Sequence, residues 1–338
     1  MKTKNFLSIL LILILSVSLT QAKIWRLDSP TAGTDPDFNT IEEAMMSNSV
    51  IDGDTLYLSG TIPATYHYLQ SFTLEKRVTI YGPGYFLNQN PETQDQPYTA
   101  YVYGLRFGTG SEGSSINGVV LGYNTYIDVN NITISRCQTG TITIASGASN
   151  IQLKQSYISG TVDMGSNNSN IQIRNNILTG TMVGVNSNSA VIISHNVLYN
   201  NYTSVHNATI NNNIIFNRGW MPNTYGNSIF NNVIKNIESQ PWPTTNNTMV
   251  TTVTYIFAGT SGTDTYPGYS EDGKFELSEG SPAIGAGFDG VDCGIFGGGT
   301  PYVLSGLPAI PHIYFIDVSG QGTTIGGLPV HIKVKSQN

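Results

Sequence analysis

NIQLKQSYISGT begins at Asn150, NIQIRNNILTGT at Asn170 and AVIISHNVLYNN at Ala190, so one outline recurs every twenty residues. Repetition at this period is typical of a stacked fold, because each unit is one coil that buries its apolar side only against its neighbours. Short alternating runs such as IQIR and VIIS are typical of strands. They lie too close together for crossover helices, so each strand must pair with its counterpart one coil away. The sequence therefore predicts an all-β protein built as a parallel β-helix.

Three columns of equivalent positions support this register. Gly140, Gly160 and Gly180 are each followed by Thr, at intervals of twenty residues. A polar column comprises Cys137, Ser156, Asn176, Asn196, Asn213 and Asn232, and an aliphatic column three residues before it comprises Ile134, Leu153, Ile173, Ile193, Ile210 and Ile229. Asparagine suits a corner because it tolerates the left-handed backbone region, and stacked amides can hydrogen-bond along the axis. We expect the polar column to be such a ladder.

The repeated outline I-x-I-x-x-N-x-I, carried by Ile173, Asn176 and Leu178, resembles the right-handed parallel β-helix repeat of the pectin-lyase-like superfamily. The segment from Asp37, DFNTIEEAMM, resembles the helix that caps such proteins at the amino end, and Thr40 with Glu43 matches a capping box. The resemblance implies a single-stranded right-handed β-helix over residues 23–300, with a short amino-terminal capping helix. It implies no particular activity, since the superfamily includes lyases, hydrolases and adhesins.

Two carboxy-terminal segments extend the resemblance. SPAIGAGFDGVDCGIFGG, from Ser281, resembles the closing rung of many bacterial secreted β-helix proteins, and the region after Pro301 resembles a tail seen on such proteins from Bacteroidetes. Residues 301–338 contain the runs HIYFIDV and VHIKVK, which predict a β-hairpin. We expect this hairpin to be a strand cap over the last coil, because an uncovered solenoid edge invites association. The alternative is a tail for export or surface attachment.

The amino terminus predicts the compartment. Lys2 and Lys4 precede an apolar run from Phe6 to Leu19, and small residues follow up to Ala22, so residues 1–22 are typical of a cleaved secretory signal peptide. A single membrane anchor is the alternative, although the run is short for a spanning helix. We expect a secreted or cell-surface protein with no integral membrane segment after cleavage. The sequence leaves open whether its destination is the periplasm or the outer surface.

Charge limits the partners. Loss of residues 1–22 removes two lysines and leaves 13 basic against 22 acidic residues, a net charge of −9. Nucleic acids and anionic lipid surfaces both reward a basic face, so neither is expected as a partner. Polyanionic sugars are disfavoured as well, unless calcium bridges the two. A polysaccharide or cell-surface glycan without such charge remains the expected partner, and the oligomeric state stays open.

The repeat region is poor in catalytic carboxylates. Residues 113–250 contain 27 asparagines but only three carboxylates, Asp128, Asp163 and Glu238. Glycoside hydrolysis uses two facing carboxylates, and a calcium-dependent lyase needs several acidic ligands with a basic residue. The sequence therefore predicts no catalytic residue, no metal site and no cofactor. The alternative is a polysaccharide lyase or glycoside hydrolase whose unusual site brings carboxylates together, or joins one to Lys154 or Arg174.

Several polar residues of the coils have simpler interpretations. Lys154 and Arg174 align one coil apart and are interpreted as outward residues of a solvated strand. His195 shares a column with Gln155, Asn175, Asn212 and Asn231, and is interpreted as a polar surface residue rather than a catalyst.

The repeat becomes irregular where aromatic residues gather. NRGWMPNTYGN and ESQPWPTTNN interrupt the coils and predict two loops. The candidate ligand-binding residues are Tyr202, Trp220, Tyr225 and Trp242. Exposed rings beside amides can stack on sugar faces, whereas the alternative is that these rings cover the core where the repeat ends. For these rings the sequence favours cover of the core, with glycan stacking as the second hypothesis. For the whole chain it favours an exported, non-catalytic β-helix protein at the cell surface or outside the cell, either glycan-contacting or an adhesin-like structural protein.

Overall fold

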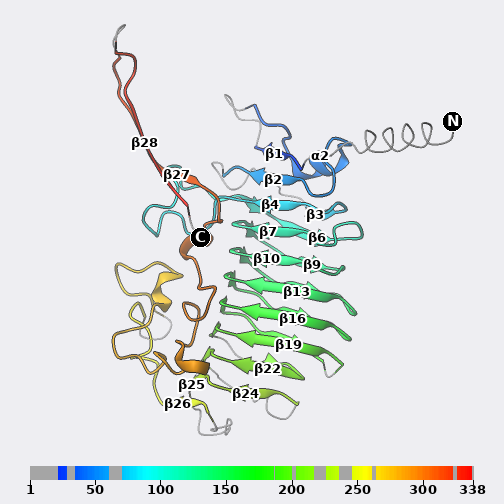
Figure 1. Cartoon of the computed structure of the whole chain (residues 1–338), viewed down its shortest axis with the longest axis vertical. Coiled ribbons are helices and arrows are strands. Elements are labelled where there is room, and N and C mark those ends of the chain that lie inside the picture. The colour runs from blue at the N-terminus through cyan, green and yellow to red at the C-terminus, as the bar shows by residue number, and fades with distance from the viewer. Residues whose placement is uncertain are drawn as a thin grey trace, which may run out of the picture.

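A computed structural model of the chain shows a parallel β-solenoid, which confirms the predicted fold class (Figure 1). The structure describes residues 22–28, 35–60, 71–185, 187–199, 203–216, 226–235, 246–260, 264–322 and 326–336. The expected signal peptide lies outside the described residues, apart from Ala22. No helix within the described ranges is long and apolar enough to cross a membrane.

Three parallel sheets run along the solenoid, and the middle coils each contribute one strand to every sheet. The ten-stranded sheet comprises β1 (Ile24–Leu27), β2 (Thr55–Leu58), β4 (Thr79–Tyr81), β7 (Ser115–Asn117), β10 (Thr133–Ser135), β13 (Ser149–Lys154), β16 (Ser169–Arg174), β19 (Ser189–Ser194), β22 (Ala208–Asn211) and β24 (Ser228–Phe230). The nine-stranded sheet comprises β5 (Tyr101–Val102), β8 (Val120–Leu121), β11 (Gln138–Thr139), β14 (Tyr157–Ile158), β17 (Ile177–Leu178), β20 (Val197–Leu198), β23 (Ile214–Ile215), β25 (Val233–Lys235) and β26 (Thr248–Val250). The seven-stranded sheet comprises β3 (Ser71–Leu74), β6 (Gly104–Phe107), β9 (Thr125–Ile127), β12 (Ile142–Ile144), β15 (Val162–Met164), β18 (Met182–Gly184) and β21 (Thr203–Ser204).

The aliphatic column forms the interior of the ten-stranded sheet. Leu153 pairs with Ile173, and Ile173 with Ile193, in unbroken register. These side chains are fully buried, while neighbours such as Gln172 point outward. The period of two within each strand therefore separates core from surface, and the period of about twenty residues stacks one coil on the next.

The predicted amide ladder is present at the corner between the ten-stranded and nine-stranded sheets. The backbone N–H of Ser156 donates to Asn176 Oδ1 at 2.9 Å, and that of Asn176 donates to Asn196 Oδ1 at 2.9 Å. Asn176 and Asn196 are completely buried. Each amide thus forms hydrogen bonds with buried backbone groups of the adjacent coil. Buried N–H and C=O groups need such partners, because an unpaired buried polar group is costly.

A short helix, α2 (Ile41–Met46), lies between β1 and β2 at the start of the solenoid. Thr40 Oγ1 accepts a hydrogen bond from the Glu43 backbone N–H at 3.0 Å, as the capping-box pattern predicts. Ile41 and Ala44 are buried against the solenoid core. The helix therefore covers apolar surface near the first strands.

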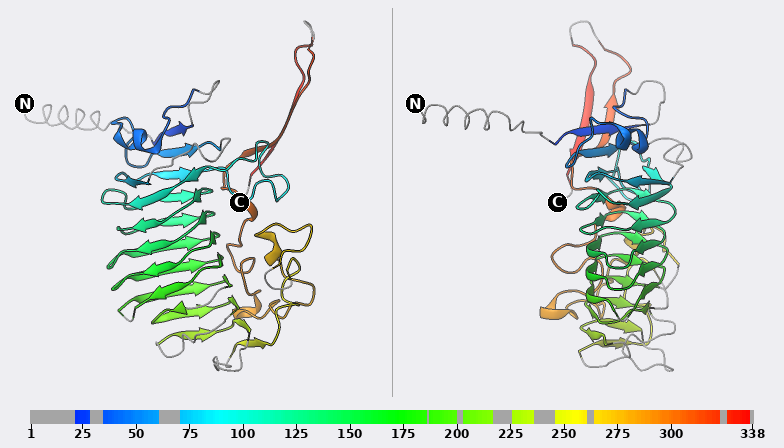
Figure 2. Two further views of the ribbon diagram at one scale, coloured as in Figure 1. Left: turned by 180° about the vertical axis from the view of Figure 1, so that it is seen from behind. Right: turned by 90° about the vertical axis from the view of Figure 1, so that its right-hand side faces the viewer.

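The chain after β26 departs from the expected closing rung. Residues 264–311, here called the return segment, lie along the outside of the nine-stranded sheet (Figures 1 and 2). Asp272 contacts Asn90 of an early loop, Cys293 contacts Asn231 of a late coil, and the chain then runs back towards the amino-terminal end, where Ser305 bonds to Tyr85. From Ser281 to the end of the return segment there is no strand, so the predicted closing rung adds no coil. The ordered turns of the return segment are η3 (Gly273–Phe275), η4 (Phe288–Gly290) and η5 (Leu304–Gly306). The outward side chains of the sheet, including Ile177 and Val197, form a second core with the return segment.

The two runs predicted as a hairpin do pair, but not over the last coil. β27 (His312–Val318) and β28 (Val330–Lys335) form an antiparallel ribbon at the amino-terminal end of the solenoid (Figures 1 and 2). Its base is held by Asp95, whose backbone N–H donates to the Ile313 carbonyl at 3.0 Å and whose carboxylate accepts from the Ile316 N–H at 2.9 Å. Because the return segment carries the chain back along the whole sheet, the hairpin emerges far from the coil that it was expected to cover.

The two cysteines, Cys137 and Cys293, are separate, buried thiols. Burial raises the pKa of Cys137 from its ordinary value of 9.0 to about 12, and that of Cys293 likewise to about 12. Both are therefore protonated and unreactive near neutral pH.

Candidate functional site

The four aromatic residues named from the sequence, Tyr202, Trp220, Tyr225 and Trp242, all lie outside the described residues. The glycan-stacking hypothesis for these four side chains therefore stays a prediction.

The polar residues considered for catalysis lie on different sheets. Lys154 and Arg174 are register partners on the ten-stranded sheet, whereas Asp163 belongs to β15 of the seven-stranded sheet. Asp128 is ion-paired with Arg106. Among the described residues, no ion pair joins Lys154 or Arg174 to a carboxylate. Glu238, the third carboxylate of the repeat region, lies outside the described residues.

The side chains in the column around His195 face the return segment. Their interpretation as polar surface residues did not predict this packing. Asn175, His195 and Asn212 all have positive φ and point their side chains towards the return segment. Asn175 Nδ2 donates to the carbonyls of Ile295 and Gly297, both at 2.9 Å. Burial against this segment, followed by the charge of nearby Arg174, lowers the pKa of His195. These side chains fasten the chain to itself and are not free for a ligand.

An exposed group of aromatic and polar side chains lies where the nine-stranded and seven-stranded sheets meet. Tyr103 and Tyr123 occupy the corner in successive coils, and their rings stack with centroids 5.3 Å apart and an interplanar angle of 11°. Tyr103 is 39% exposed and Tyr123 55% exposed. Later coils carry Gly and Thr at this corner, as in Gly140 and Thr141. The paired rings therefore stand at the end of a line of small residues.

Polar groups surround the rings on the adjoining strands. The Arg106 guanidinium lies 4.4 Å from the centroid of the Tyr126 ring and is ion-paired with Asp128. Asn124 Nδ2 donates to the Tyr126 hydroxyl at 3.1 Å. We call Tyr103, Arg106, Tyr123, Asn124, Tyr126 and Asp128 the tyrosine patch. It offers apolar ring surface beside hydrogen-bonding groups, and the adjacent opposite charges leave it close to neutral.

The tyrosine patch was missed at the level of sequence, although the signal was there. Tyr103 and Tyr123 are one period of twenty residues apart, as are Arg106 and Tyr126. Residues one period apart lie side by side on the same face of a solenoid, so these spacings predict both contacts.

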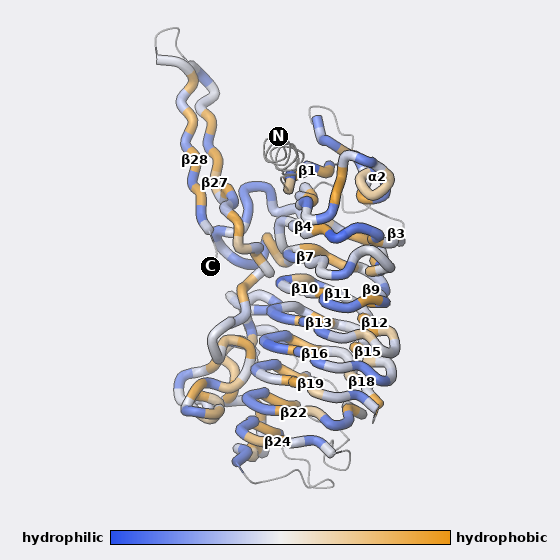
Figure 3. The backbone as a smooth tube through the Cα atoms, turned by 45° about the vertical axis from the view of Figure 1, so that its right-hand side comes forward, coloured by the Kyte–Doolittle hydropathy of each residue, from blue (hydrophilic) through white to orange (hydrophobic). Residues whose placement is uncertain are grey.

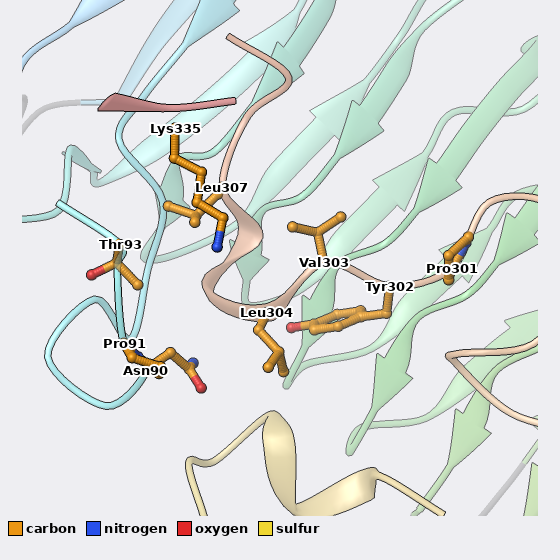
Figure 4. Close-up of a pocket in the computed structure, with 9 residues that line it drawn as sticks. All are labelled: Asn90, Pro91, Thr93, Pro301, Tyr302, Val303, Leu304, Leu307 and Lys335. Atoms are coloured by element: carbon orange, nitrogen blue, oxygen red, sulfur yellow. The ribbon is translucent and has the colours of Figure 1, made fainter. Parts of the chain in front are cut away.

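A pocket lies farther along, between the return segment, the loop at Asn90 and the base of the hairpin (Figure 4). It has a volume of about 390 Å³. Pro91, Val303 and Leu304 line it with apolar surface, and Lys335 points into the space beside Thr93. Lys335 is ion-paired with Glu92 at 2.8 Å. The polar groups at this pocket are engaged within the protein, which indicates a packing gap at a junction.

A buried polar cluster beside the pocket explains how the junction is held. Asp272 is fully buried, and its carboxylate accepts from Ser305 N–H at 2.7 Å and from Asn90 Nδ2 at 3.0 Å. It also accepts from the Tyr302 hydroxyl at 3.3 Å, which in turn contacts the Tyr85 hydroxyl. Burial raises the pKa of both tyrosines well above the usual value. The cluster is closed to solvent and joins three distant parts of the chain.

Within the described part of the chain, no group of three or more His, Cys, Asp or Glu side chains is placed to hold a metal ion. Comparisons of the chain with protein-family models, with curated proteins and with solved structures each gave no match.

Proposed function

We propose that the chain is an exported, non-catalytic β-helix protein that binds a neutral glycan through the tyrosine patch. The observation that carries this proposal is the parallel stack of Tyr103 and Tyr123 on an otherwise small-residue corner. Tyrosine offers a large, rigid surface that is apolar on its faces and polar at its tip, so little conformational entropy is lost on binding. Sugar rings present C–H faces edged with hydroxyl groups, which match such a surface.

The polar part of the patch favours a neutral sugar. Asp128 and Asn124 offer oxygen acceptors, and Arg106 and Asn124 offer N–H donors to hydroxyl groups. Because Arg106 is already paired with Asp128, it has no uncompensated charge for a sugar carboxylate. The acidic chain, with a formal net charge of −7, also repels polyanions at a distance.

Binding without cleavage follows from the same residues. The patch contains one carboxylate, Asp128, whereas hydrolysis of a glycosidic bond uses two. The resemblance of the repeat to the pectin-lyase-like superfamily supports an extracellular, carbohydrate-rich setting. The apolar amino terminus supports export, and mass spectrometry of protein recovered from the cell exterior would test it by locating cleavage after Ala22.

The binding proposal predicts that Tyr103→Ala and Tyr123→Ala each weaken glycan binding by about tenfold or more, as expected for aromatic anchors. A panel of neutral polysaccharides would identify a ligand by affinity electrophoresis, and titration calorimetry would then measure the variants. Tyr123→Phe keeps the ring and should keep most of the affinity. Tyr255→Ala is the matched control, because Tyr255 is 71% exposed and lies outside the patch.

Two further arms separate the alternatives. If Trp220→Ala with Trp242→Ala abolishes binding while the patch variants bind normally, the two loops hold the glycan and the patch proposal fails. Unsaturated products or new reducing ends, tested with and without calcium, would replace the proposal with a lyase or hydrolase. Thermal unfolding of every variant checks that the fold is intact.

A further inference from the structure

The hairpin has one face made entirely of branched aliphatic side chains. Cross-strand pairing places Ile313 opposite Val334, Ile316 opposite Ile332, and Val318 opposite Val330. Val330, Ile332 and Val334 are alternate residues of β28 and share a face. A bulge between Ile313 and Phe315 takes up one extra residue of β27, so the three partners on that strand lie on the same face. The six side chains are between 39% and 57% exposed. Figure 3 shows hydrophobic positions recurring along both strands.

The opposite face of the hairpin carries charged and polar side chains together with one aromatic ring. It carries Asp317 opposite His331 and Phe315 opposite Lys333. The Phe315 ring is 38% exposed and contacts the Lys333 ammonium, 5.1 Å from its centroid, and the His331 ring, with centroids 5.4 Å apart. The hairpin is thus amphipathic: one face suits water, and the aliphatic face does not.

Little of the described chain supports the hairpin. Among the described residues, its hydrogen bonds and ion pair to the body are made with Glu92 and Asp95 and extend no farther along β27 than Ile316. The ribbon projects beyond the first coils (Figure 2). An isolated two-stranded hairpin is marginal in water, and its open edges and apolar face favour association. An aliphatic face on a projecting ribbon therefore indicates a surface that becomes covered by another molecule.

From this pattern we infer that the aliphatic face pairs with the same face of a second copy of this chain. The partner surface must be flat and uncharged, because the aliphatic side chains of this face can neither donate nor accept a hydrogen bond. Outside the hairpin, the exposed large aliphatic side chains among the described residues are Ile24, Met46, Val183, Val185 and Ile284. These are scattered over different elements and form no comparable face, whereas the hairpin face matches itself.

Two hairpins meeting face to face form a four-stranded sandwich about 10 Å thick, related by a two-fold axis. The central pair Ile316–Ile332 lies at that axis and the β-branched side chains interdigitate. Lys333, Lys335 and His331 stay on the outside, so like charges are not brought together. Because the ribbons project from the bodies, two acidic solenoids can join without direct contact between them.

The test is the molar mass of the full chain, measured by analytical ultracentrifugation over a range of concentrations. We expect a dimer that persists at high salt, because apolar contacts are not screened. Ile316→Lys with Ile332→Lys should raise the dissociation constant at least about a hundredfold. Lys333→Thr, on the opposite face of the same strand, is the matched control and should leave the dimer intact.

A cross-linking experiment tests the inference even if the two lysine substitutions unfold the hairpin. Cys137 and Cys293 are buried, so a cysteine introduced on the hairpin is the reactive one. Ile332→Cys should form an intermolecular disulfide under mild oxidation, and Lys333→Cys should not. A monomeric wild-type chain, or a dimer indifferent to these substitutions, overturns the inference. So does a monomer that co-sediments with phosphatidylcholine vesicles, which would make a lipid surface the occupant.

Discussion

Asparagine meets two different requirements at adjacent positions of one corner. Asn175 takes the left-handed backbone conformation, with φ of 54°, and turns its amide outward. Asn176 follows it and turns its amide inward, where Nδ2 donates to the Leu153 carbonyl at 2.9 Å. The first amide fastens the return segment and the second continues the buried ladder. The pair NN at this corner therefore reflects two physical constraints and no catalytic chemistry.

The ladder predicts that Asn196→Ala strongly lowers the free energy of unfolding. Asn196 Nδ2 donates to the Ile173 carbonyl at 2.8 Å, and its Oδ1 accepts from the Asn176 backbone N–H at 2.9 Å. Alanine leaves both groups buried without partners, at a cost of about 1–3 kcal/mol each. We expect the free energy of unfolding to fall by about 3 kcal/mol in urea titration.

The control for this ladder is Ser166→Ala. The Ser166 hydroxyl donates to Ser146 Oγ at 3.0 Å, one coil away, but this pair is exposed and water can replace it. The change should stay within about 0.5 kcal/mol, as for most surface substitutions. Equal losses at Asn196 and Ser166 would show that burial of the amide is not what matters.

At the scale of elements, the nine-stranded sheet shows what the sequence predicts and what it does not. Ile177 and Leu178 follow Asn176 directly, as Val197 and Leu198 follow Asn196. Two adjacent aliphatic residues in one strand indicate burial on both faces, so a cover over this sheet was foreseeable. The sequence did not predict which residues form this cover, because they come from beyond the last coil and share no period with the repeat.

The return segment is held by side chains whose removal should release it. Asn175→Gly keeps the left-handed conformation and deletes the amide that binds the Ile295 and Gly297 carbonyls. Hydrogen–deuterium exchange of peptides covering residues 287–300 should become at least several-fold faster. Asn150→Gly is the matched control, since Asn150 also has positive φ, at 57°, but bonds only within its exposed column. Unchanged exchange in Asn175→Gly would mean that apolar packing alone holds the segment.

At the scale of the whole molecule, the return segment alters the thermodynamics expected of a solenoid. In a linear stack each coil contacts only its neighbours, so the ends can unfold separately. Here the Gly294 N–H donates to the Asn212 carbonyl at 2.9 Å, and the Tyr85 N–H donates to the Ser305 carbonyl at 2.8 Å. One continuous segment thus contacts a late coil and an early one. Such contacts couple the two ends of the stack.

Asp272 is the residue on which this coupling can be tested. Its carboxylate joins the return segment at Ser305 to the early loop at Asn90, so Asp272→Ala leaves several buried donors without an acceptor. We expect a loss of about 3 kcal/mol or more and a smaller denaturant slope, because the carboxy-terminal coils then unfold before the rest. Hydrogen exchange should show the coils around β22 and β23 opening ahead of β7 and β10. Asp163→Ala, an exposed carboxylate on β15, should change neither quantity. A variant that is less stable but unfolds in one transition with an unchanged slope would show that neighbouring coils alone make the solenoid cooperative.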